Sequence, residues 1–329
     1  FQDFSCWTST HGIPHIGMAN TVWLRAIWIL VVIGCIFGFI TQLEFLIQKY
    51  LSYSVNTETN LEYSERPFPV ITICHLNPWK RDALQNSTYM SDMINAYTDT
   101  SQPHPEFGFT SFNSLRQQTA VTLTSLAYEH IYGDLVNSTN SAIQSQDPGY
   151  SYSDLIVSCT YNADTCNDTD FTATMDPYFG QCITYNANES HISSRAGPLY
   201  GLELIIKTDM SQYLPWTDSA GVNVAIHNKS DPPYPDISGY YCPPGTASSL
   251  GIEYTTTNRL PAPFGDCTTE QETVMRNYVG MYQTEGCIRS CLQDRIIDQC
   301  GCYSPALPYI NHNASIPSCF QKDNEMATY

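Results

Sequence analysis

The longest apolar stretch of the chain is a run of 18 residues without a charged side chain, residues 26–43 (AIWILVVIGCIFGFITQL). As an α-helix this run would be about 27 Å long, close to the thickness of the hydrocarbon core of a bilayer. Arg25 and Lys49 flank it, and their charged ends can reach the two interfaces. Amphipathic aromatic residues that can anchor the ends also lie nearby: Trp23, Trp28 and Tyr50. The pattern predicts a transmembrane helix over residues 22–50.

Two other readings of this stretch are a buried core helix and a cleaved signal peptide. A core helix would show one polar face, and no polar side chain appears in the run before Thr41. A signal peptide would have a basic beginning and a cleavage site of small residues, but residues 1–21 contain no Lys or Arg and no such site closes the run. We therefore favour the membrane span.

Beyond the span, alternating or continuous apolar positions predict β-strands. They lie at Val70–Ile73, Tyr178–Asn186, Leu202–Ile206 and Val222–Ile226. The last two fall within residues 198–262, which we interpret as a compact multi-stranded unit.

Helical patterns are expected at Thr88–Tyr97, Ser114–Tyr132, Thr268–Tyr282 and Ile288–Gln299. On the last of these helices, four residues share one face: Ile288, Cys291, Leu292 and Ile296. The mixture of helices and strands predicts an α+β body of some 280 residues, enough for its own hydrophobic core.

The sides of the membrane are assigned from glycosylation sequons and cysteines. Eleven of the 13 cysteines follow the span, which is typical of an oxidising compartment. The N-x-S/T acceptor sites all follow it too: Asn86, Asn137, Asn167, Asn188, Asn228 and Asn313. We therefore place the N-terminus inside and the large body outside. The positive-inside rule gives no help, because the N-terminal flank has no basic residue to count.

The charge of the chain belongs to that body. The net charge is −18, and the first 50 residues contribute equal numbers of acidic and basic side chains. An acidic surface makes nucleic acid and anionic lipid headgroups poor partners. It would concentrate cations near the membrane, although ordinary solubility of a secreted domain explains the same charge.

The cysteines favour disulfides over a metal site. Six of them crowd the end of the chain: Cys267, Cys287, Cys291, Cys300, Cys302 and Cys319. Zinc is the competing reading, but no paired C-x-x-C knuckles occur and the nearby sequons indicate export. Eleven cysteines cannot all pair within one chain, so we expect some partners to lie outside these 329 residues.

Two smaller motifs occur near the span. His11-Gly12 precedes Pro14 in a tight turn, and on composition alone this histidine is more often a surface residue than a functional one. Gly34 and Gly38 form a G-x-x-x-G pair, which allows close helix packing but is common by chance.

These residues together resemble the degenerin/epithelial sodium channel family, which includes the acid-sensing ion channels and the nematode degenerins. The resemblance is an ordered series of motifs over nearly the whole chain: Ser9–Gly12, Phe68–Cys74, Gly180–Asn186, Gly221–His227, Pro244–Thr246, Arg259–Cys267 and Gly286–Cys302. The run Phe68–Lys80 resembles the degenerin branch most.

The resemblance implies a membrane protein with two transmembrane helices per subunit, a disulfide-rich ectodomain and three subunits around a pore. Residues 1–21 would be a cytoplasmic segment and residues 22–50 the first transmembrane helix. Residues 51–329 would be an incomplete extracellular domain, with the finger at about 77–177, the β-ball and palm at about 178–266 and the thumb at about 267–329.

The resemblance also implies roles for single residues. His11 and Gly12 would belong to a re-entrant segment at the inner end of the pore. Phe264 would touch Tyr50 or Tyr53 above the span and couple the ectodomain to the gate, and the choice between the two tyrosines stays open. The implied disulfides are Cys74–Cys182, Cys159–Cys166 and Cys302–Cys319, with Cys267, Cys287, Cys291 and Cys300 pairing outside this chain. Cys242 has no obvious counterpart.

The chain departs from the family in lacking a second apolar span and the Gly-x-Ser filter that it would carry. We therefore expect a fragment of a subunit of a sodium-selective channel in the plasma membrane, in a homo- or hetero-trimer. It would need membrane lipid and the permeant Na⁺, but no covalent catalysis, cofactor, metal or nucleic acid. An extracellular ligand or matrix, protons or mechanical load could open it, and the sequence does not choose among these stimuli.

Two alternatives fit the topology. A lumenal glycosyltransferase of type II topology would use a D-x-D metal motif, which Asp168-Thr169-Asp170 supplies, but Asp168 lies within the Asn167 sequon. A single-pass receptor or adhesion protein stapled by disulfides needs no second span. A second apolar run encoded after Tyr329 would distinguish the channel from the receptor.

Overall fold

The computed structural model describes most of the chain, namely residues 4, 7–8, 11–61, 65–85, 87–99, 120, 123–128, 130–131, 148–188, 190–193, 195–265, 277, 281–304, 306–307, 309 and 316–319. The chain divides into two compact units. The first comprises residues 1–61 and 255–269, and the second comprises residues 62–254 and 270–329. Within the described residues, the first unit is built on helices and the second contains the sheets.

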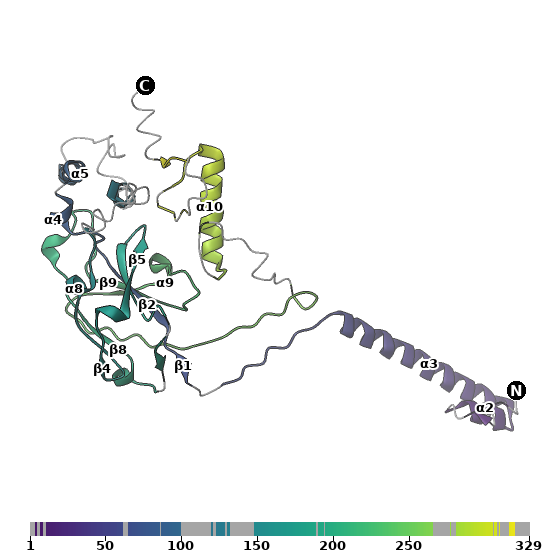
Figure 1. Cartoon of the computed structure of the whole chain (residues 1–329). Coiled ribbons are helices and arrows are strands. Elements are labelled where there is room, and N and C mark those ends of the chain that lie inside the picture. The colour runs from purple at the N-terminus through teal and green to yellow at the C-terminus, as the bar shows by residue number, and fades with distance from the viewer. Residues whose placement is uncertain are drawn as a thin grey trace. The chain divides into compact units, whose positions relative to one another are not determined.

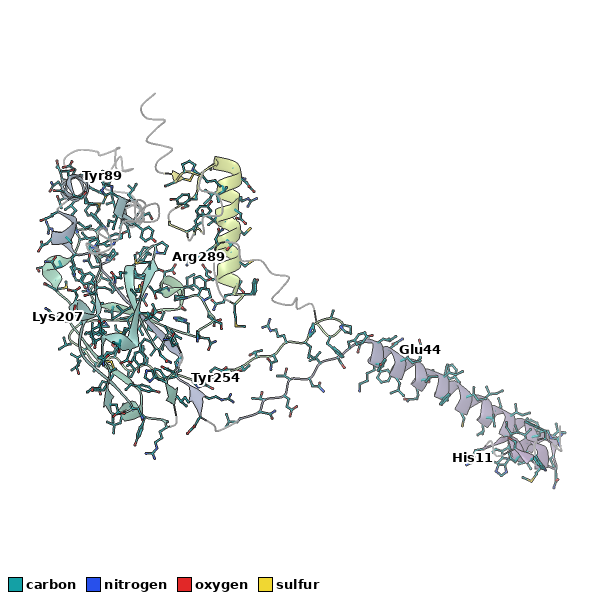
Figure 2. All side chains as sticks on the ribbon, viewed as in Figure 1. His11, Glu44, Tyr89, Lys207, Tyr254 and Arg289 are labelled. Atoms are coloured by element: carbon teal, nitrogen blue, oxygen red, sulfur yellow. A yellow bond between two sulfur atoms is a disulfide. The ribbon has the colours of Figure 1, made fainter. Side chains whose placement is uncertain are left out.

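The first unit is dominated by one long helix, α3 (Val22–Leu51, 30 residues), with the short helix α2 (Ile13–Met18) before it (Figure 1). None of the residues of α3 is buried, and Figure 2 shows side chains projecting from it on all sides. Its most apolar 18-residue window has a mean hydropathy of 2.4, so it is long and apolar enough to cross a membrane. The predicted helix over residues 22–50 is confirmed.

Two polar side chains of α3 make hydrogen bonds within the helix. The hydroxyl of Thr41 donates to the carbonyl of Gly38 at 2.9 Å, and the amide of Gln48 donates to Glu44 at 3.3 Å. Such local hydrogen bonds allow a helix to enter a medium without water. A helix that is apolar on every side and has no buried residue fits a bilayer better than it fits water.

The second unit contains a five-stranded antiparallel sheet in the order β10-β9-β2-β6-β5. The strands are β2 (Val70–His75), β5 (Phe171–Asp176), β6 (Gly180–Tyr185), β9 (Val222–His227) and β10 (Tyr240–Cys242). Every residue of β2 is buried, because this strand lies in the middle of the sheet with both faces covered. Its nearly continuous apolar sequence is typical of such a position.

A second, three-stranded sheet packs against the first, in the order β4-β3-β8. Its strands are β3 (Ile156–Tyr161), β4 (Asp164–Thr165) and β8 (Leu202–Ile206). Apolar side chains from both sheets form one core, which includes Ile71, Ile73, Leu155, Ile156, Tyr161, Ile183, Tyr185 and Val222. A small two-stranded sheet pairs β1 (Arg66–Pro67) with β7 (Ile192–Ser193).

The interpretation of residues 198–262 as a compact unit is wrong. The strand β8 pairs with β3, whereas β9 and β10 belong to the other sheet, where β9 pairs with β2. After Cys242, residues 243–260 form no helix or strand. Alternation of apolar residues identifies a strand, but it carries no information about the partner that the strand will find.

The remaining short helices of the second unit lie around these sheets. They are α4 (Arg81–Leu84), α5 (Thr88–Thr98), α8 (Tyr152–Leu155), α9 (Pro235–Ser238) and the 3₁₀ turns η2 (Asp168–Asp170), η3 (Pro198–Tyr200) and η4 (Met210–Gln212). The predicted helix at Thr88–Tyr97 is confirmed by α5. Its buried side chains, among them Met90 and Met93, form a second core with Trp79, Leu123 and Trp216. Only part of the helix expected at 114–132 falls among the described residues, and that part is helical.

The last helix of the described chain is α10 (Thr284–Cys300). The helix expected at Ile288–Gln299 is thus present, but the apolar face expected on it is not the buried face. The buried residues are Gly286, Ser290 and Gln293, whereas Ile288 and Leu292 are 57% and 49% exposed. Most of the helix expected at 268–282 lies outside the described residues, and residues 281–282 are not helical.

Candidate functional site

The segment before the long helix folds back against it. His11 and Gly12 form the turn that begins α2, and Gly12 has a φ of +94°, which only glycine adopts without strain. A Cβ at Gly12 would lie 2.7 Å from Cγ2 of Val32 on α3. Glycine is therefore required at this position for two reasons, its backbone conformation and its closeness to α3.

Ring stacking and one hydrogen bond hold this helical hairpin together. The imidazole of His15 stacks on the indole of Trp28, with 4.4 Å between ring centroids and 17° between planes. Ile16 is the buried residue of α2. The guanidinium of Arg25 donates to the carbonyl of Ala19 at 3.2 Å, which closes the turn between the two helices. The hairpin thus presents the His11-Gly12 turn beside the N-terminal half of α3.

The structure brings Phe264 against a tyrosine at the other end of α3. The rings of Tyr53 and Phe264 meet edge to face with 5.6 Å between centroids, and both residues belong to the first unit. Tyr50 is 78% exposed, and among the described residues no aromatic contact joins it to Phe264. Of the two tyrosines that the sequence left open, Tyr53 is the one in contact.

The described chain contains three disulfides, Cys74–Cys182, Cys159–Cys166 and Cys302–Cys319. They are the three pairs that the family resemblance implied. The first joins the neighbouring strands β2 and β6, where Cys74 and Cys182 lie directly opposite each other and are both fully buried. The second closes the β3–β4 hairpin.

The other cysteines of the ectodomain are distributed differently. Cys242 lies at the end of β10, and Cys287 and Cys291 lie on α10, one turn apart. None of these three forms a disulfide with a described residue. Cys300 is the last residue of α10, and Cys267 lies outside the described residues.

Three of the six sequons can be placed in the structure, and all three asparagines are exposed: Asn167, Asn188 and Asn228. They lie at one end of the five-stranded sheet, because they adjoin the start of β5, the end of β6 and the end of β9. Asn86, Asn137 and Asn313 lie outside the described residues.

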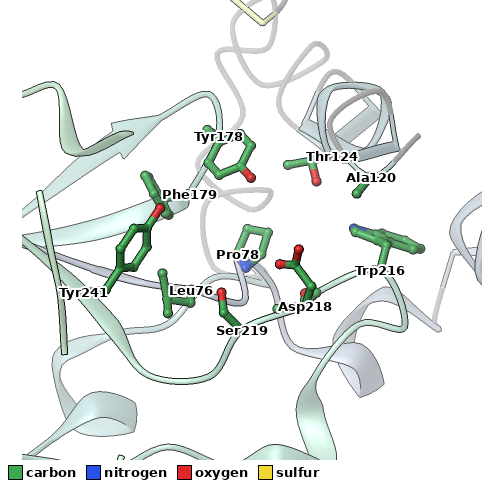
Figure 3. Close-up of a pocket in the computed structure, with 11 residues that line it drawn as sticks. Leu76, Pro78, Ala120, Thr124, Tyr178, Phe179, Trp216, Asp218, Ser219 and Tyr241 are labelled. Atoms are coloured by element: carbon green, nitrogen blue, oxygen red, sulfur yellow. The ribbon is translucent and has the colours of Figure 1, made fainter. Parts of the chain in front are cut away.

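The opposite end of the sheet carries a cavity of about 320 Å³, shown in Figure 3. It opens beside the turn between β5 and β6, the first residues after β2 and the loop that precedes β9. Its lining includes Pro78, Phe179, Trp216, Asp218 and Tyr241. No local sequence pattern predicts this cavity, since its lining residues are spread over five separate segments.

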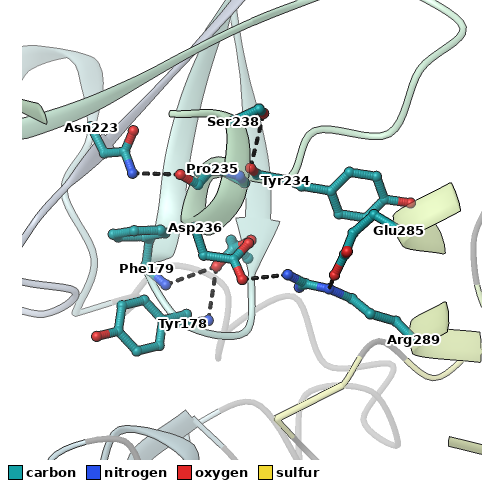
Figure 4. Close-up of polar contacts among 10 residues, drawn as sticks. Tyr178, Phe179, Asn223, Tyr234, Pro235, Asp236, Ser238, Glu285 and Arg289 are labelled. Carbon is teal, nitrogen blue, oxygen red and sulfur yellow. Dashed lines mark hydrogen bonds and ion pairs between the residues drawn. The ribbon is translucent and has the colours of Figure 1, made fainter. Parts of the chain in front are cut away.

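One arginine joins α10 to the short helix α9 (Figure 4). The guanidinium of Arg289 pairs with Glu285 on its own helix and with Asp236 on α9, and it lies 5.3 Å from the ring centroid of Tyr234. Close by, the carboxylate of Asp176 accepts hydrogen bonds from two backbone N–H groups of the β5–β6 turn. Burial raises the pKa of the Asp176 carboxyl above its ordinary value, and these hydrogen bonds act in the opposite direction.

A buried polar cluster connects β2 to the loops that follow it. Asn77 is fully buried, and its side chain joins five groups: the carbonyls of Trp79 and Gln212, the hydroxyls of Tyr150 and Thr217, and the backbone N–H of Leu214. His75 is also fully buried, and its ring stacks on Tyr150 at 4.0 Å. Burial lowers the pKa of His75 from 6.5 to about 4, while its hydrogen bond with the Asn77 backbone acts in the opposite direction. Both side chains act structurally, as anchors between elements.

Among the described residues, no group of three or more His, Cys, Asp or Glu side chains could hold a metal ion. The Asp168-Thr169-Asp170 motif of the enzyme alternative forms the 3₁₀ turn η2. In that turn, the backbone N–H of Asn167 donates to Asp170, and Asn167 accepts from Thr169. This D-x-D sequence is therefore a capped turn.

Comparison with known proteins decides the family. Residues 4–329 match the family described as "Amiloride-sensitive sodium channel". The chain belongs to this family. Its members are ion channels, so the chain is not an enzyme, and the long apolar helix α3 is the membrane helix of a membrane protein.

The relatives include several nematode degenerins. The chain is 48% identical to degenerin del-1 of Caenorhabditis elegans over 165 residues, which cover 49% of this chain and 25% of the relative. It is 25% identical to degenerin mec-10 of Caenorhabditis briggsae over 465 aligned positions, covering 94% of this chain and 64% of the relative. Degenerin-like protein asic-1 of Caenorhabditis elegans is 37% identical over 189 residues, 54% of this chain and 23% of the relative. The chain thus spans less than two thirds of each of these relatives.

Proposed function

We propose that this chain is part of one subunit of a trimeric, sodium-selective cation channel in the plasma membrane. The observation that carries the proposal is the match to the amiloride-sensitive sodium channel family over residues 4–329. The exposed apolar helix α3, followed by a disulfide-bonded body, supports it. A ligand, protons or mechanical load acting on the body opens the pore.

The hairpin of α2 and α3 supports a pore role for His11 and Gly12. Gly12 in its turn has a positive φ and lies close to Val32, and a larger residue would be strained on both counts. A re-entrant turn of this kind can approach a narrow axis closely, as the inner end of a pore requires. In the complete subunit, these two residues line that inner end.

The contact between Tyr53 and Phe264 supports a role in gating. Tyr53 follows α3 directly, and Phe264 lies at the end of the long segment that leaves the five-stranded sheet after β10. A force on the sheet is transmitted through that segment to the ring of Phe264, and from there to α3. Tyr50, which is exposed, has a smaller part in this transmission.

The body contributes charge, glycans and further disulfides. Its acidic surface raises the local concentration of Na⁺ near the pore. The six sequons carry N-linked glycans outside the cell. Cys267, Cys287, Cys291 and Cys300 pair with cysteines of a longer chain. For α10 this is supported by its exposed side, where Ile288 and Leu292 lie beside Cys291.

The proposal is tested by expressing the chain encoded by the complete transcript and recording current while protons, peptides or membrane stretch are applied. An inward sodium current blocked by amiloride is expected, with three bleaching steps for fluorescently tagged subunits. Surface-expressed protein that carries no current under any stimulus and bleaches in one step would instead indicate a single-pass receptor.

Two variant pairs test the site residues in the same cells. Gly12→Ala is expected to abolish the current without loss of surface protein, whereas Gly34→Ala is expected to keep it, since a Cβ at Gly34 meets no atom within 4 Å. The double variant Tyr53→Ala/Phe264→Ala is expected to change gating no more than either single variant does, because both remove the same contact. The effects of Tyr50→Ala and Phe264→Ala are expected to add. Equal effects of the two glycine variants would remove His11-Gly12 from the pore.

A further inference from the structure

The cavity at the sequon-free end of the described sheet has a buried floor and an exposed rim. Thr124, Phe179 and Trp216 are 7%, 1% and 4% exposed and form the floor together with Pro78. The rim consists of Tyr178, Asp218, Ser219 and Tyr241, all of which are exposed to solvent. A cavity of this volume is large enough for a small molecule.

A buried donor on the floor lacks a partner. The indole nitrogen of Trp216 makes no hydrogen bond with the described residues, although the side chain is almost completely buried. In Figure 3 the nitrogen lies on the cavity side of the ring. A buried N–H without an acceptor is unfavourable, so this group favours an occupant that brings an acceptor atom into the cavity.

Among the described residues that line the cavity, Asp218 has the only charged side chain, and its carboxylate points into the cavity (Figure 3). No hydrogen bond or ion pair joins Asp218 to another described residue. Its charge acts on the neighbouring phenol, because the pKa of Tyr178 is raised by burial first and then by the charges of Tyr241 and Asp218, among others. Because its described lining has one carboxylate and no basic residue, the cavity attracts a cation and repels an anion.

The aromatic rings specify the cation further. Tyr178, Phe179, Trp216 and Tyr241 surround the same space. Such rings attract an organic ammonium through their electron-rich faces and pack against an apolar body, whereas a hydrated metal ion would need several oxygen ligands. Among the described residues no such group of metal ligands exists.

We propose that this cavity is a binding site for a small organic ammonium with an apolar body and one hydrogen-bond acceptor. The ammonium pairs with Asp218 at the rim, the body packs on Phe179 and Pro78, and the acceptor takes the N–H of Trp216. Because the cavity joins the β5–β6 turn to the loop before β9, an occupant bridges the two segments.

Two probes of nearly identical shape test the proposal on the full 329-residue chain in nanodiscs. Tyramine carries an ammonium, an aromatic body and a phenol oxygen, and tyrosol replaces the ammonium with a neutral hydroxyl. Binding is measured by calorimetry and by saturation-transfer NMR at fixed salt. Tyramine is expected to bind at least about 10-fold more tightly than tyrosol.

Variants then locate the binding. Asp218→Asn is expected to bring the affinity for tyramine down to that for tyrosol, and because Asp218 is exposed the fold should be kept. The matched control is Asp164→Asn, an equally exposed acid on β4, which should change neither affinity. Trp216→Phe is expected to weaken both probes, with its melting temperature measured alongside to detect a loss of fold.

Three results would overturn the proposal: no binding of either probe, equal binding of both, or tyramine binding that survives Asp218→Asn. The measurement needs no current. A negative result therefore leaves the proposed channel function standing, and a silent channel leaves the binding site standing.

Discussion

The two longest helices of the described residues, α3 and α10, both expose large apolar side chains, but for different reasons. In α3 apolar residues surround the whole helix, and none of its residues is buried. In α10 the apolar Ile288 and Leu292 are exposed, whereas the polar Gln293 is completely buried. The apolar side chains of α3 are therefore exposed because they face lipid. In α10 the buried Gln293 side chain forms hydrogen bonds with the backbone of a neighbouring segment.

The comparison shows that an apolar side chain is not always the one that is buried. In α10, hydrogen bonds to the backbone decide which side chain lies inside. The amide of Gln293 donates to the carbonyl of Ser304 at 3.0 Å and accepts from the N–H of the same residue at 3.0 Å. It thereby satisfies both backbone groups of Ser304, which follows the isolated β-bridge between Tyr303 and Ser318. An unsatisfied backbone group in that position costs as much free energy as burial of an isoleucine would gain.

The largest effect is expected when charged residues are introduced into α3, which faces lipid, and compared with the same change in α10, which faces water. In α3, Ile33→Asp with Ile36→Asp raises the apparent free energy of membrane insertion by about 6 kcal/mol. The same change at Ile288 and Leu292, whose exposure is similar, costs the fold less than about 1 kcal/mol. Translation with microsomes measures this, because a chain whose α3 fails to insert leaves its sequons unglycosylated. Full glycosylation of the α3 variant would show that α3 is not the anchor.

The second effect concerns the polar interior of α10. Gln293→Leu leaves the N–H and carbonyl of Ser304 without partners and destabilises the described end of the chain by about 3 kcal/mol. Gln299→Leu on the exposed side of the same helix is the control, and it should change stability by less than about 0.5 kcal/mol. Hydrogen exchange of residues 303–307 reports the difference. Equal protection of these amides from exchange in both variants would mean that the hydrogen bonds of Gln293 do not stabilise this segment.

The third effect is a pH dependence of the stability of the second unit, which comes from its buried residue His75. The pKa of His75 is lowered to about 4 in the fold, below the ordinary value of 6.5, so the fold favours the neutral ring. The stabilising contribution is complete above pH 6.5 and is lost as the pH falls toward 4. Between pH 7 and pH 5 the free energy of unfolding should drop by about 2 kcal/mol on account of this group.

The variant His75→Gln isolates the contribution of His75 to this pH dependence, because it removes the titrating ring and leaves the carboxylates and tyrosines in place. The difference in stability between the variant and the unmodified chain should therefore shrink by about 2 kcal/mol as the pH falls from 7 to 5. Chemical denaturation at both pH values measures it. A difference independent of pH would show that His75 is protonated in the fold or solvated.

The smallest effect is expected for the arginine that joins α10 to α9. The side chains of Arg289 and Asp236 are 16% and 32% exposed, so solvent screens their attraction. Arg289→Gln should cost about 0.5–1 kcal/mol at low salt and less at high salt. Arg295→Gln, on the exposed side of α10, should cost nothing measurable. If Arg289→Gln lowered the free energy of unfolding by more than about 2 kcal/mol at every salt concentration, the contacts of Arg289 would be shielded from solvent, as those of Gln293 are.

Several features could be read directly from the sequence. The α3 helix ends within one residue of its predicted end, because 18 consecutive uncharged residues have no alternative structure that satisfies their backbone in lipid. The strands β2 and β6 were also predicted, since their apolar β-branched residues lie between breakers. The turn at His11-Gly12 was identified from its glycine and proline.

Other features required the tertiary structure. The cavity combines Pro78, Trp216 and Tyr241, which no local pattern connects. Arg289 and Asp236 are 53 residues apart, and nothing in either segment selects the other. The choice of Tyr53 over Tyr50 as the neighbour of Phe264 likewise depends on where the chain turns after α3.

By itself, then, the sequence determined the membrane helix, the individual strands and the turn before the span. These depend on the solvent of each segment and on hydrogen bonds between close neighbours in the chain. Only the tertiary structure decided which strands pair, which side of α10 is buried and where a cavity remains. Those outcomes depend on shape and on hydrogen-bond partners from distant segments, and a pattern of apolar positions records neither.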